Sequence, residues 1–331
     1  MGTSLWGASS RNAGFACFGS PGELLDDLQT HDEDTVFSLV EKRWKGLQKL
    51  RKGLGDKTID FHNWGGYEVF DSKEEYERCS TRLEYLNKNL GFIGSSKNIY
   101  REASPKIKVF GMRRLAGMLV NTTEGQIDTG KMISALVRKA QQAGVLIING
   151  VEVDRVEEQG NGVEIVSKSG ALFQCRRVVL CTNGFTNQLF PGLGVEPARA
   201  QVLITKPIAN LSLKGTFHFD KGYYYFRNIG NRVLLGGGRN LDFKTEETDQ
   251  QGLTALVQNR LEELLQDMIL PNEKPEIEMR WSGIMGVGTE KTAIVKSLSP
   301  NIYCAVRMGG MGVAIGSLVG EEVARLVIES L

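Results

Sequence analysis

Histidine, cysteine and proline are scarce in this chain, and their scarcity excludes several kinds of site. The 331 residues include 3 histidines, 5 cysteines and 8 prolines. His31, His62 and His218 are far apart and show no metal-ligand spacing, so we predict no metal centre. The odd, scattered cysteines do not have the spacing of a disulfide framework. We interpret the cysteines as mostly small core residues and the histidines as surface or loop residues rather than catalytic bases.

The chain also lacks an excess of either charge and any long apolar run. It has 40 basic and 39 acidic residues, a formal net charge of +1, which gives no electrostatic reason to expect nucleic acid as a partner. No apolar run reaches the length of a membrane span, and the start lacks the charged and apolar regions of a signal peptide. We therefore predict no nucleic-acid partner, no membrane span and a cytoplasmic location. The oligomeric state stays open.

Glycine, by contrast, is plentiful, and a Gly-rich turn near the C-terminus is the most informative segment. A short apolar strand over Ile302–Val306 leads into this turn, and a helix follows to the end of the chain. Gly309, Gly310 and Gly312 allow the backbone to approach a ligand, and the amides that begin the helix point outward with partial positive charge. The turn suits a phosphate or an electron-rich ring edge. The alternative is a tight turn packed on its own protein.

Three other segments have the composition of ligand-binding loops. Residues 7–15 are small and polar with one arginine, residues 182–185 (Thr-Asn-Gly-Phe) follow an apolar strand over 178–181, and residues 280–283 read Arg-Trp-Ser-Gly. Together with the Gly-rich turn, and in the same order, they resemble the FAD-dependent oxidoreductases of the D-amino-acid oxidase and glycine oxidase family. The resemblance covers nearly the whole chain and is weakest in the substrate region.

The resemblance implies FAD as the cofactor and an α/β (α+β) fold. A Rossmann-like FAD-binding domain would be interleaved with a substrate, or cap, domain built on an antiparallel sheet. The first domain is expected at residues 1–20, 125–199 and 284–331, and the second at residues 21–124 and 200–283.

The resemblance also assigns roles to the loops. The first loop would run along the flavin, the Gly-rich turn would close over the flavin ring, and the middle turn would approach the dinucleotide. Val151 and Val153 would lie beside the adenine, although ordinary strand valines are an equal alternative. The implied cofactor-binding residues are Ser9, Ser10, Arg11, Asn12, Ala13, Gly14, Val153, Thr182, Asn183, Gly184, Gly309, Gly310, Met311, Gly312 and Val313.

One departure from the family concerns the cofactor directly. The family normally opens with a strand, a G-x-G-x-x-G turn that admits the pyrophosphate, a helix and a second strand. None of the 39 glycines stands in such a turn. Residues 1–6 read like the end of that unit, so we expect an N-terminal truncation of roughly forty residues, about the size of a βαβ start. A non-catalytic fragment that retains no flavin is therefore an alternative.

Apolar periodicity predicts the elements between the loops. Helical spacing occurs over 36–50 and over 76–90, the latter after a capping box at Ser72 and Glu75, and these helices flank a strand near 67–70. No repeats are present.

The sequence pattern in the middle of the chain predicts helices and strands in alternation. Asp128 can cap a helix that ends at Gly144. The apolar run over 145–148 is typical of a buried parallel strand. A hairpin over 162–175 and the buried strand over 178–181 follow.

Residues 200–282 alternate and turn often, as in an antiparallel sheet, with one helix over 250–268. Arginines on such a sheet could bind a substrate carboxylate through a two-pronged hydrogen bond. The candidates are Arg227, Arg239, Arg280 and the tyrosines 223–225. The alternative is that the tyrosines are core residues and the arginines are solvated, because strand residues alternate faces.

Many family members have an arginine-proline pair after the Trp-x-Gly motif to bind the carboxylate. Residues 284–286 read Ile-Met-Gly here, which weakens the prediction of an amino-acid substrate.

The resemblance implies oxidation of the C–N bond of an amine or amino acid, with hydride transfer to the flavin and hydrolysis of the imine. Positive groups should lie where the reduced flavin gains charge, and Arg307 with the amides of 309–312 is the candidate. The predicted catalytic set is Arg307, Arg280, Tyr225 and Arg227, and Arg307→Ala should slow flavin reduction. The electron acceptor would be oxygen or, in a dehydrogenase, a quinone or carrier.

Overall fold

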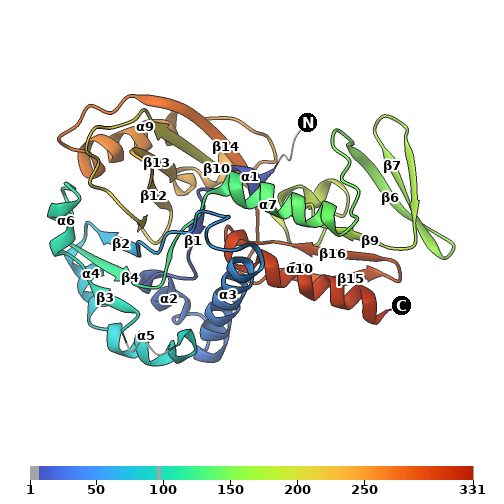
Figure 1. Cartoon of the computed structure of the whole chain (residues 1–331), viewed down its shortest axis with the longest axis horizontal. Coiled ribbons are helices and arrows are strands. Elements are labelled where there is room, and N and C mark those ends of the chain that lie inside the picture. Colours follow the sequence, from blue (N-terminus) through green and yellow to red (C-terminus); the bar gives the residue numbers. More distant parts are fainter. Residues whose placement is uncertain (1–6, 95–97, 331) are drawn as a thin grey trace.

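An eight-stranded sheet dominates the computed structural model, which describes residues 7–94 and 98–330 (Figure 1). Its strand order is β14-β10-β13-β12-β11-β2-β4-β3. Neighbouring strands are antiparallel except β11 and β2, which are parallel. The predicted antiparallel sheet is confirmed. The strands are β2 (Gly66–Phe70), β3 (Tyr100–Glu102), β4 (Gly117–Asn121), β10 (Glu196–Thr205), β11 (Thr216–Phe219), β12 (Tyr224–Ile229), β13 (Arg232–Gly237) and β14 (Ile277–Val287).

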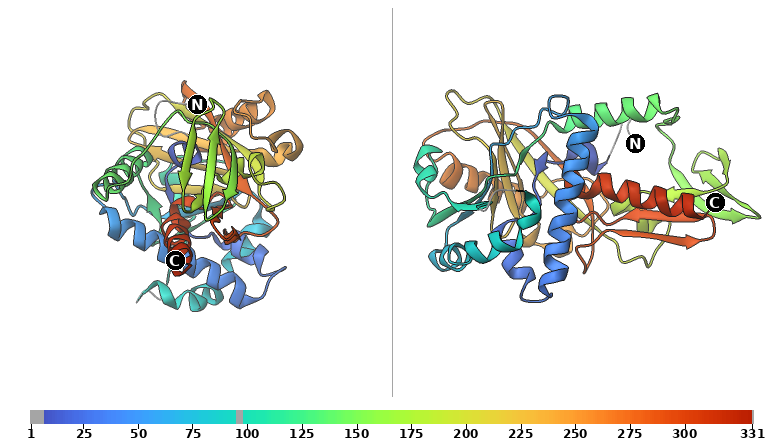
Figure 2. Two further views of the ribbon diagram at one scale, coloured as in Figure 1. Left: turned by 90° about the vertical axis from the view of Figure 1, so that its right-hand side faces the viewer. Right: turned by 60° about the horizontal axis from the view of Figure 1, so that its bottom comes forward.

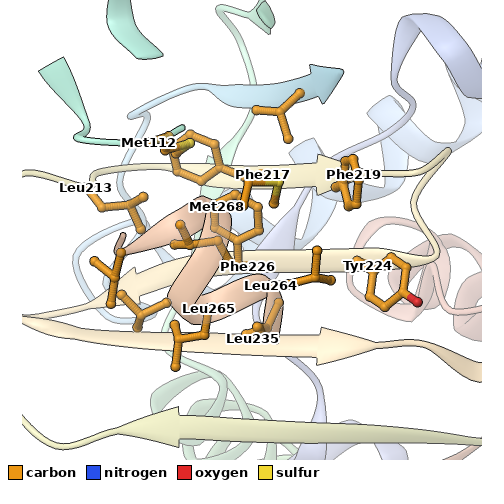
Figure 3. Packing of buried hydrophobic residues seen from close by; sticks show 14 of the residues in the cluster. Met112, Leu213, Phe217, Phe219, Tyr224, Phe226, Leu235, Leu264, Leu265 and Met268 are labelled. Atoms are coloured by element: carbon orange, nitrogen blue, oxygen red, sulfur yellow. The ribbon is translucent and has the colours of Figure 1, made fainter. Parts of the chain in front are cut away.

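The two faces of this sheet differ because side chains alternate along each strand. One face is apolar and packs under α9 (Ala255–Leu264) and the π-helical turn Leu265–Ile269 (Figure 3). Phe217 and Phe226 stack there with ring centroids 4.8 Å apart. The opposite face carries His218, Tyr225 and Arg227, which are one residue out of step with those phenylalanines. Burial of the phenylalanines in the large core therefore places His218, Tyr225 and Arg227 on the opposite face of the sheet.

Three smaller sheets are formed by the rest of the described strands. Strands β15 (Ile294–Ser299), β16 (Ile302–Val306) and β9 (Val178–Leu180) form one sheet, in which β16 and β9 are parallel. An antiparallel meander of β6 (Val153–Gln159), β7 (Gly162–Ser167) and β8 (Leu172–Cys175) lies at the end of the molecule remote from the large sheet (Figure 1). The short pair β1 (Phe15–Ala16) and β5 (Gly125–Gln126) joins the first loop to the middle of the chain.

Helix packing links the two ends of the chain. The helix α3 (Glu33–Leu54) crosses α10 (Gly312–Glu329) near its start (Figure 2). The crossing is close because Gly46 has no Cβ, which would lie 2.1 Å from the Ala314 carbonyl oxygen. The other helices are α1 (Ala8–Arg11), α2 (Pro21–Asp27), α4 (Lys73–Ser80), α5 (Leu83–Asn89), α6 (Pro105–Val109), α7 (Thr129–Gln142) and α8 (Phe243–Glu246). Among the described residues no helix has the length and apolar character needed to cross a membrane.

The predicted helix starts are confirmed. The Asp128 carboxylate accepts a hydrogen bond from the Lys131 amide at 2.9 Å, and the Ser72 hydroxyl accepts one from the Glu75 amide at 3.2 Å. The helix predicted over 76–90 is instead two helices, α4 and α5, which are separated at Thr81.

The predicted strand over 145–148 is wrong. No strand forms there, and the exposed fractions of Val145, Leu146 and Ile148 are 52%, 82% and 54%. A continuous apolar run becomes a buried strand only when neighbours cover both its faces. Within the described residues, β9 pairs with β16 alone, so no such neighbour is available to residues 145–148.

Two strands extend past the predicted domain boundaries. β10 begins before residue 200, and β14 continues beyond residue 283. The helix α3, which was assigned to the substrate domain, packs on α10 of the flavin domain. The domain division stays a prediction. The segment 1–6, interpreted as the end of a dinucleotide-binding unit, lies outside the described residues.

Candidate flavin and substrate site

Strand β14 is the common support of the three loops that the sequence singles out. Arg11 in the first loop donates a hydrogen bond from Nη1 to the Ser282 carbonyl at 3.1 Å, and Trp281 Nε1 donates one to the Arg11 carbonyl at 3.0 Å. The other two loops meet the same strand a few residues later, at Met285 and Gly286. Segments from the start, middle and end of the chain therefore adjoin one strand.

The first loop is held by the Asn12 side chain. Ser9, Ser10 and Arg11 belong to α1, and Asn12 follows directly. The Asn12 side-chain oxygen accepts hydrogen bonds from the Gly14 amide at 2.8 Å and the Thr129 hydroxyl at 3.2 Å. Ala13 lies between these two anchored residues.

The turn that ends this loop requires glycine. Gly14 has a φ of +71°, and a Cβ there would lie 2.5 Å from the Ile127 carbonyl oxygen. The loop is therefore shaped to lie close against β5 and the start of α7.

The middle turn is locked to the Gly-rich turn through Asn183. Its side-chain oxygen accepts hydrogen bonds from the backbone amides of Arg307 and Met308, each at 3.1 Å. Gly184 packs against β14, because a Cβ there would lie 2.5 Å from the Met285 carbonyl oxygen. Thr182 precedes this turn, and its hydroxyl lies 3.1 Å from that of Thr186.

The Gly-rich turn presents exposed backbone at the start of α10. Gly309 and Gly310 have φ values of +57° and +80°, and both are exposed, as is Gly312. Helix α10 has 18 residues and no side-chain cap, so the positive end of its dipole faces outward. Met311 and Val313 are half-buried beside it.

Two of the predicted catalytic arginines bind protein groups elsewhere. The Arg307 guanidinium donates to the carbonyl oxygens of Thr292 at 3.0 Å and Gly194 at 3.3 Å. Arg280 lies on the α9 face of the large sheet and donates to Gln258 at 2.6 Å and to Glu262 at 2.8 Å. Arg280 is thus separated by the sheet from Tyr225 and Arg227.

Arg227 is buried on the loop-facing side of the sheet. Its Nη1 donates to the Ile127 carbonyl at 2.8 Å and to the Gly14 carbonyl at 3.3 Å. Within the described residues no carboxylate forms a salt bridge with it, and its buried Nε has no hydrogen-bond partner. Burial lowers the pKa of Arg227 to about 10. The arginine therefore brings a positive charge against the first loop.

Tyr225 lies on the same face, two residues before Arg227. Its ring lies over Gly236, where a Cβ would be 2.7 Å from the ring atoms. Burial raises the pKa of its hydroxyl to about 12, so the hydroxyl stays protonated. Tyr224 instead belongs to the apolar core, and Tyr223 is 36% exposed. Arg239, the other candidate arginine, lies over the Phe243 ring.

The sequence did not lead us to include His218 among the site residues, and its interpretation as a surface or loop histidine is wrong. It lies inside β11, opposite Tyr225, and its ring centroid is 5.2 Å from that of Phe15 in the first loop. Burial lowers the pKa of His218 to about 4, so the imidazole is neutral at neutral pH. The signal was available: His218 stands between Phe217 and Phe219, so strand alternation turns it away from their apolar face.

Buried carboxyl groups hold the chain that follows the first loop. Glu124 accepts hydrogen bonds from the amides of Phe18 at 2.7 Å and Gly19 at 3.2 Å, and burial raises its pKa to about 8. Glu68 accepts one from the Gly22 amide at 2.8 Å, and burial raises its pKa to about 7. Glu124 thus anchors the segment between β1 and α2, and Glu68 anchors the first turn of α2.

Comparison with known proteins identifies the family. The family model described as "FAD dependent oxidoreductase" (DAO) matches residues 2–326. The chain belongs to this family.

Relatives of the DAO chain are distant in sequence. The probable oxidoreductase OrdL of Rhizobium meliloti is 24% identical over 265 residues, which are 78% of this chain and 58% of that protein. The chain thus spans less than two thirds of that relative's length. The OrdL protein of Haemophilus influenzae is 20% identical over 339 residues, covering 98% of this chain and 75% of that protein.

Solved structures share the DAO fold. Glycine oxidase from Geobacillus kaustophilus has a TM-score of 0.76 at 19% identity and covers 99% of this chain and 86% of its own. L-proline dehydrogenase from P. horikoshii has a TM-score of 0.74 at 18% identity, with coverages of 98% and 84%. The predicted mixed α/β fold is confirmed.

FAD is the cofactor of the DAO family, and the residues around β14 fit its ring end. The exposed glycines 309, 310 and 312 leave room for a planar ligand, and the uncapped start of α10 suits its electron-rich edge. Ser9 and Ser10 line a groove of about 340 Å³ together with apolar residues of α7 and Ile147. Val153 begins β6 and pairs with Ser167 in the meander sheet.

Proposed function

We propose that this DAO-family chain oxidises the C–N bond of an amine or amino acid. One observation carries the proposal: the first loop contacts Trp281 and Arg227, and the Gly-rich turn lies beside the Met285 side chain. Strand register and alternation place these side chains on the face of the large sheet that presents Tyr225. A cofactor against these loops and a substrate against the sheet would then face each other. When bound, FAD supplies the acceptor for a hydride from the carbon that bears the amine.

The protein residues would position and polarise the reactants. Asn183 fixes the Gly-rich turn through its two hydrogen bonds. The exposed amides of that turn and the α10 dipole would stabilise negative charge at the ring. Arg227 holds the first loop through the Gly14 carbonyl. Tyr225 would supply a protonated hydroxyl as a hydrogen-bond donor to the substrate. We do not place the side chains of Arg280 and Arg307 in contact with substrate, because both are bound to protein groups.

The substrate class is proposed from the site and from the names of structural neighbours. Glycine oxidase, iminodiacetate oxidase and L-proline dehydrogenase all act on amino compounds, as their names state. Ile284, Met285 and Gly286 stand where many family members have the arginine-proline pair that binds a carboxylate. Both an oxidase and a dehydrogenase occur among these neighbours, so the electron acceptor is oxygen or a carrier.

Anaerobic flavin reduction tests the proposal. The purified chain, supplied with FAD, should show protein-bound flavin absorbance, and that absorbance should bleach with at least one of glycine, sarcosine, proline and benzylamine. Admission of oxygen then separates an oxidase, which releases peroxide, from a dehydrogenase, which needs an added quinone. Tyr225→Phe should slow the bleaching, whereas Arg280→Gln should not. A chain that holds flavin but is bleached by none of the four compounds overturns the proposal.

A further inference from the structure

His218 has unused hydrogen-bonding capacity on the loop-facing side of the large sheet. The ring is half-buried, and within the described residues no group forms a hydrogen bond with either nitrogen. It packs edge-on against Phe15, which in turn lies edge-on to Tyr225 at 5.7 Å. A polar side chain is thus held in a defined position by Phe15, while its nitrogens have no hydrogen-bond partner among the described residues.

The other two histidines provide an internal contrast. His31 lies 2.9 Å from the Thr30 hydroxyl, and His62 lies 3.1 Å from the Asp60 carboxylate. His62 also stacks on Trp64 with a centroid distance of 4.2 Å. Both are therefore engaged with neighbouring residues, unlike His218.

We propose that the His218 imidazole accepts a hydrogen bond from the N–H of the substrate amine, and so orients the neutral amine for oxidation. This inference rests on the proposed function and names the residue that touches the reacting nitrogen. Phe15 and Tyr225 would then flank the carbon that carries the amine.

The chemistry requires a neutral amine. As the C–H bond breaks, its electron pair leaves with the hydride to FAD, and the nitrogen lone pair forms the C=N bond of an iminium ion. Water then hydrolyses the iminium ion to a carbonyl compound and the released amine. A protonated amine has no lone pair to form that bond. An acceptor that takes one N–H therefore leaves the lone pair of a neutral amine free.

The groups around His218 favour this role. Burial lowers its pKa to about 4, so that it accepts rather than donates as a cation above that pH. In the sheet His218 is the register partner of Tyr225 on β12 and of Glu68 on β2. The nearby Glu23 carboxylate acts against burial and raises the pKa of His218. The Glu68 carboxyl is occupied by the Gly22 amide. The Glu23 carboxylate is already ion-paired with Arg43 and Lys291, and the tyrosine hydroxyl stays protonated. The face therefore gives no strong support to a bound ammonium ion.

Two variants distinguish the hydrogen-bond acceptor of His218 from the packing of its ring against Phe15. His218→Phe keeps an aromatic ring against Phe15 but removes the acceptor, whereas His218→Gln keeps an acceptor oxygen. The rate of flavin reduction is measured with a substrate that bleaches the flavin, at concentrations below saturation. His218→Phe should lower this rate roughly tenfold, the size expected for the loss of one hydrogen bond. His218→Gln should stay within about threefold of the parent. His31→Gln, at an exposed position, is the matched control and should leave the rate unchanged.

A second readout does not depend on flavin. The three histidine Cε1–H signals can be assigned in the NMR spectrum with His31→Gln, His62→Gln and His218→Gln. Methylamine, benzylamine or sarcosine, added at alkaline pH, should shift the His218 signal and leave the other two in place. Sodium benzoate, which carries no amine, should not shift it.

The outcomes distinguish this inference from the proposed function. Flavin bleaching that is equal in His218→Phe and the parent overturns the role of His218 and leaves the function standing. A His218 shift with amines in a chain whose flavin is never bleached supports the amine contact and overturns the function. A His218 signal that responds to benzoate alone, or to none of the three amines, overturns the inference.

Discussion

The side-chain oxygen of Asn183 accepts a hydrogen bond from the Met308 amide at 3.1 Å. Through this contact the turn after β9 and the turn before α10 form one unit, although more than one hundred residues separate them in the chain. The same oxygen also accepts from the Arg307 amide. Arg307 has a φ of +64°, and Asn183 one of +46°, so both turns contain left-handed backbone.

Loss of the Asn183 acceptor should loosen this unit. Asn183→Gly tolerates the positive φ but leaves two backbone amides without a partner, at a cost of about 1–3 kcal/mol in the free energy of unfolding. Asn183→Asp keeps an acceptor and should lose less. Urea unfolding measures the cost, and the flavin content after gel filtration measures the effect on binding. Equal stability of the two variants would contradict the role given to the side-chain oxygen.

Gly14→Ala should be far more damaging than a glycine replacement on α10. The new methyl group would strike the Ile127 carbonyl at 2.5 Å, and a φ of +71° is unfavourable for alanine. We expect a loss of about 1–3 kcal/mol, together with weaker flavin binding. Gly316→Ala is the control. It lies inside a helix with no atom within 4 Å of the new Cβ, so it should raise stability by about 0.5–1 kcal/mol.

Arg227→Met should destabilise the first loop. The change removes the donor to the buried carbonyls of Ile127 and Gly14, and we expect a cost of about 2–4 kcal/mol. Arg239→Met, which removes a guanidinium that lies over Phe243, should cost less than about 1 kcal/mol. Denaturant unfolding of both variants checks the difference, and comparable losses would argue against an anchoring role for Arg227.

Glu124 should make stability depend on pH. Burial raises its pKa in the folded chain from 4.5 to about 8, so between these values the unfolded chain binds fewer protons than the folded one. Stability must therefore fall as pH rises through this window. Glu68, with a pKa of about 7, acts in the same direction.

Glu124→Gln keeps the acceptor for the Phe18 and Gly19 amides and cannot ionise. Its free energy of unfolding, relative to the parent, should therefore rise from about pH 5 to about pH 8. Denaturant unfolding at several pH values measures this difference. A difference that stays constant across the window would show that Glu124 does not titrate as described.

The ends of the chain were informative in the sequence because their glycines and asparagines are dictated by backbone geometry. Gly14, Gly309 and Gly310 all have positive φ, and such positions can be recognised without knowing what they contact. The helix caps at Ser72 and Asp128 were predictable for the same local reason.

The roles of the sheet residues were not predictable, because they depend on which face each strand presents. Arg280 and Arg227 look equivalent in the sequence, yet one binds α9 and the other binds the first loop. The register of eight strands decides this, and no local pattern contains it. His218 could have been placed by alternation alone, since Phe217 and Phe219 identify the apolar face. The strand over 145–148 failed because burial depends on neighbours that the run itself does not specify.

The parallel pairing of β2 with β11 also governs how the chain can fold. About 150 residues separate Gly66 from its partner Thr216 in the chain. The ribosome therefore makes β2 and β4 well before most of the other strands of their sheet. The strand β9 waits in the same way for β16, which emerges almost last. The early-made strands of both sheets therefore lack some of their partners while translation continues, an arrangement that favours slow folding and transient exposure of apolar surface.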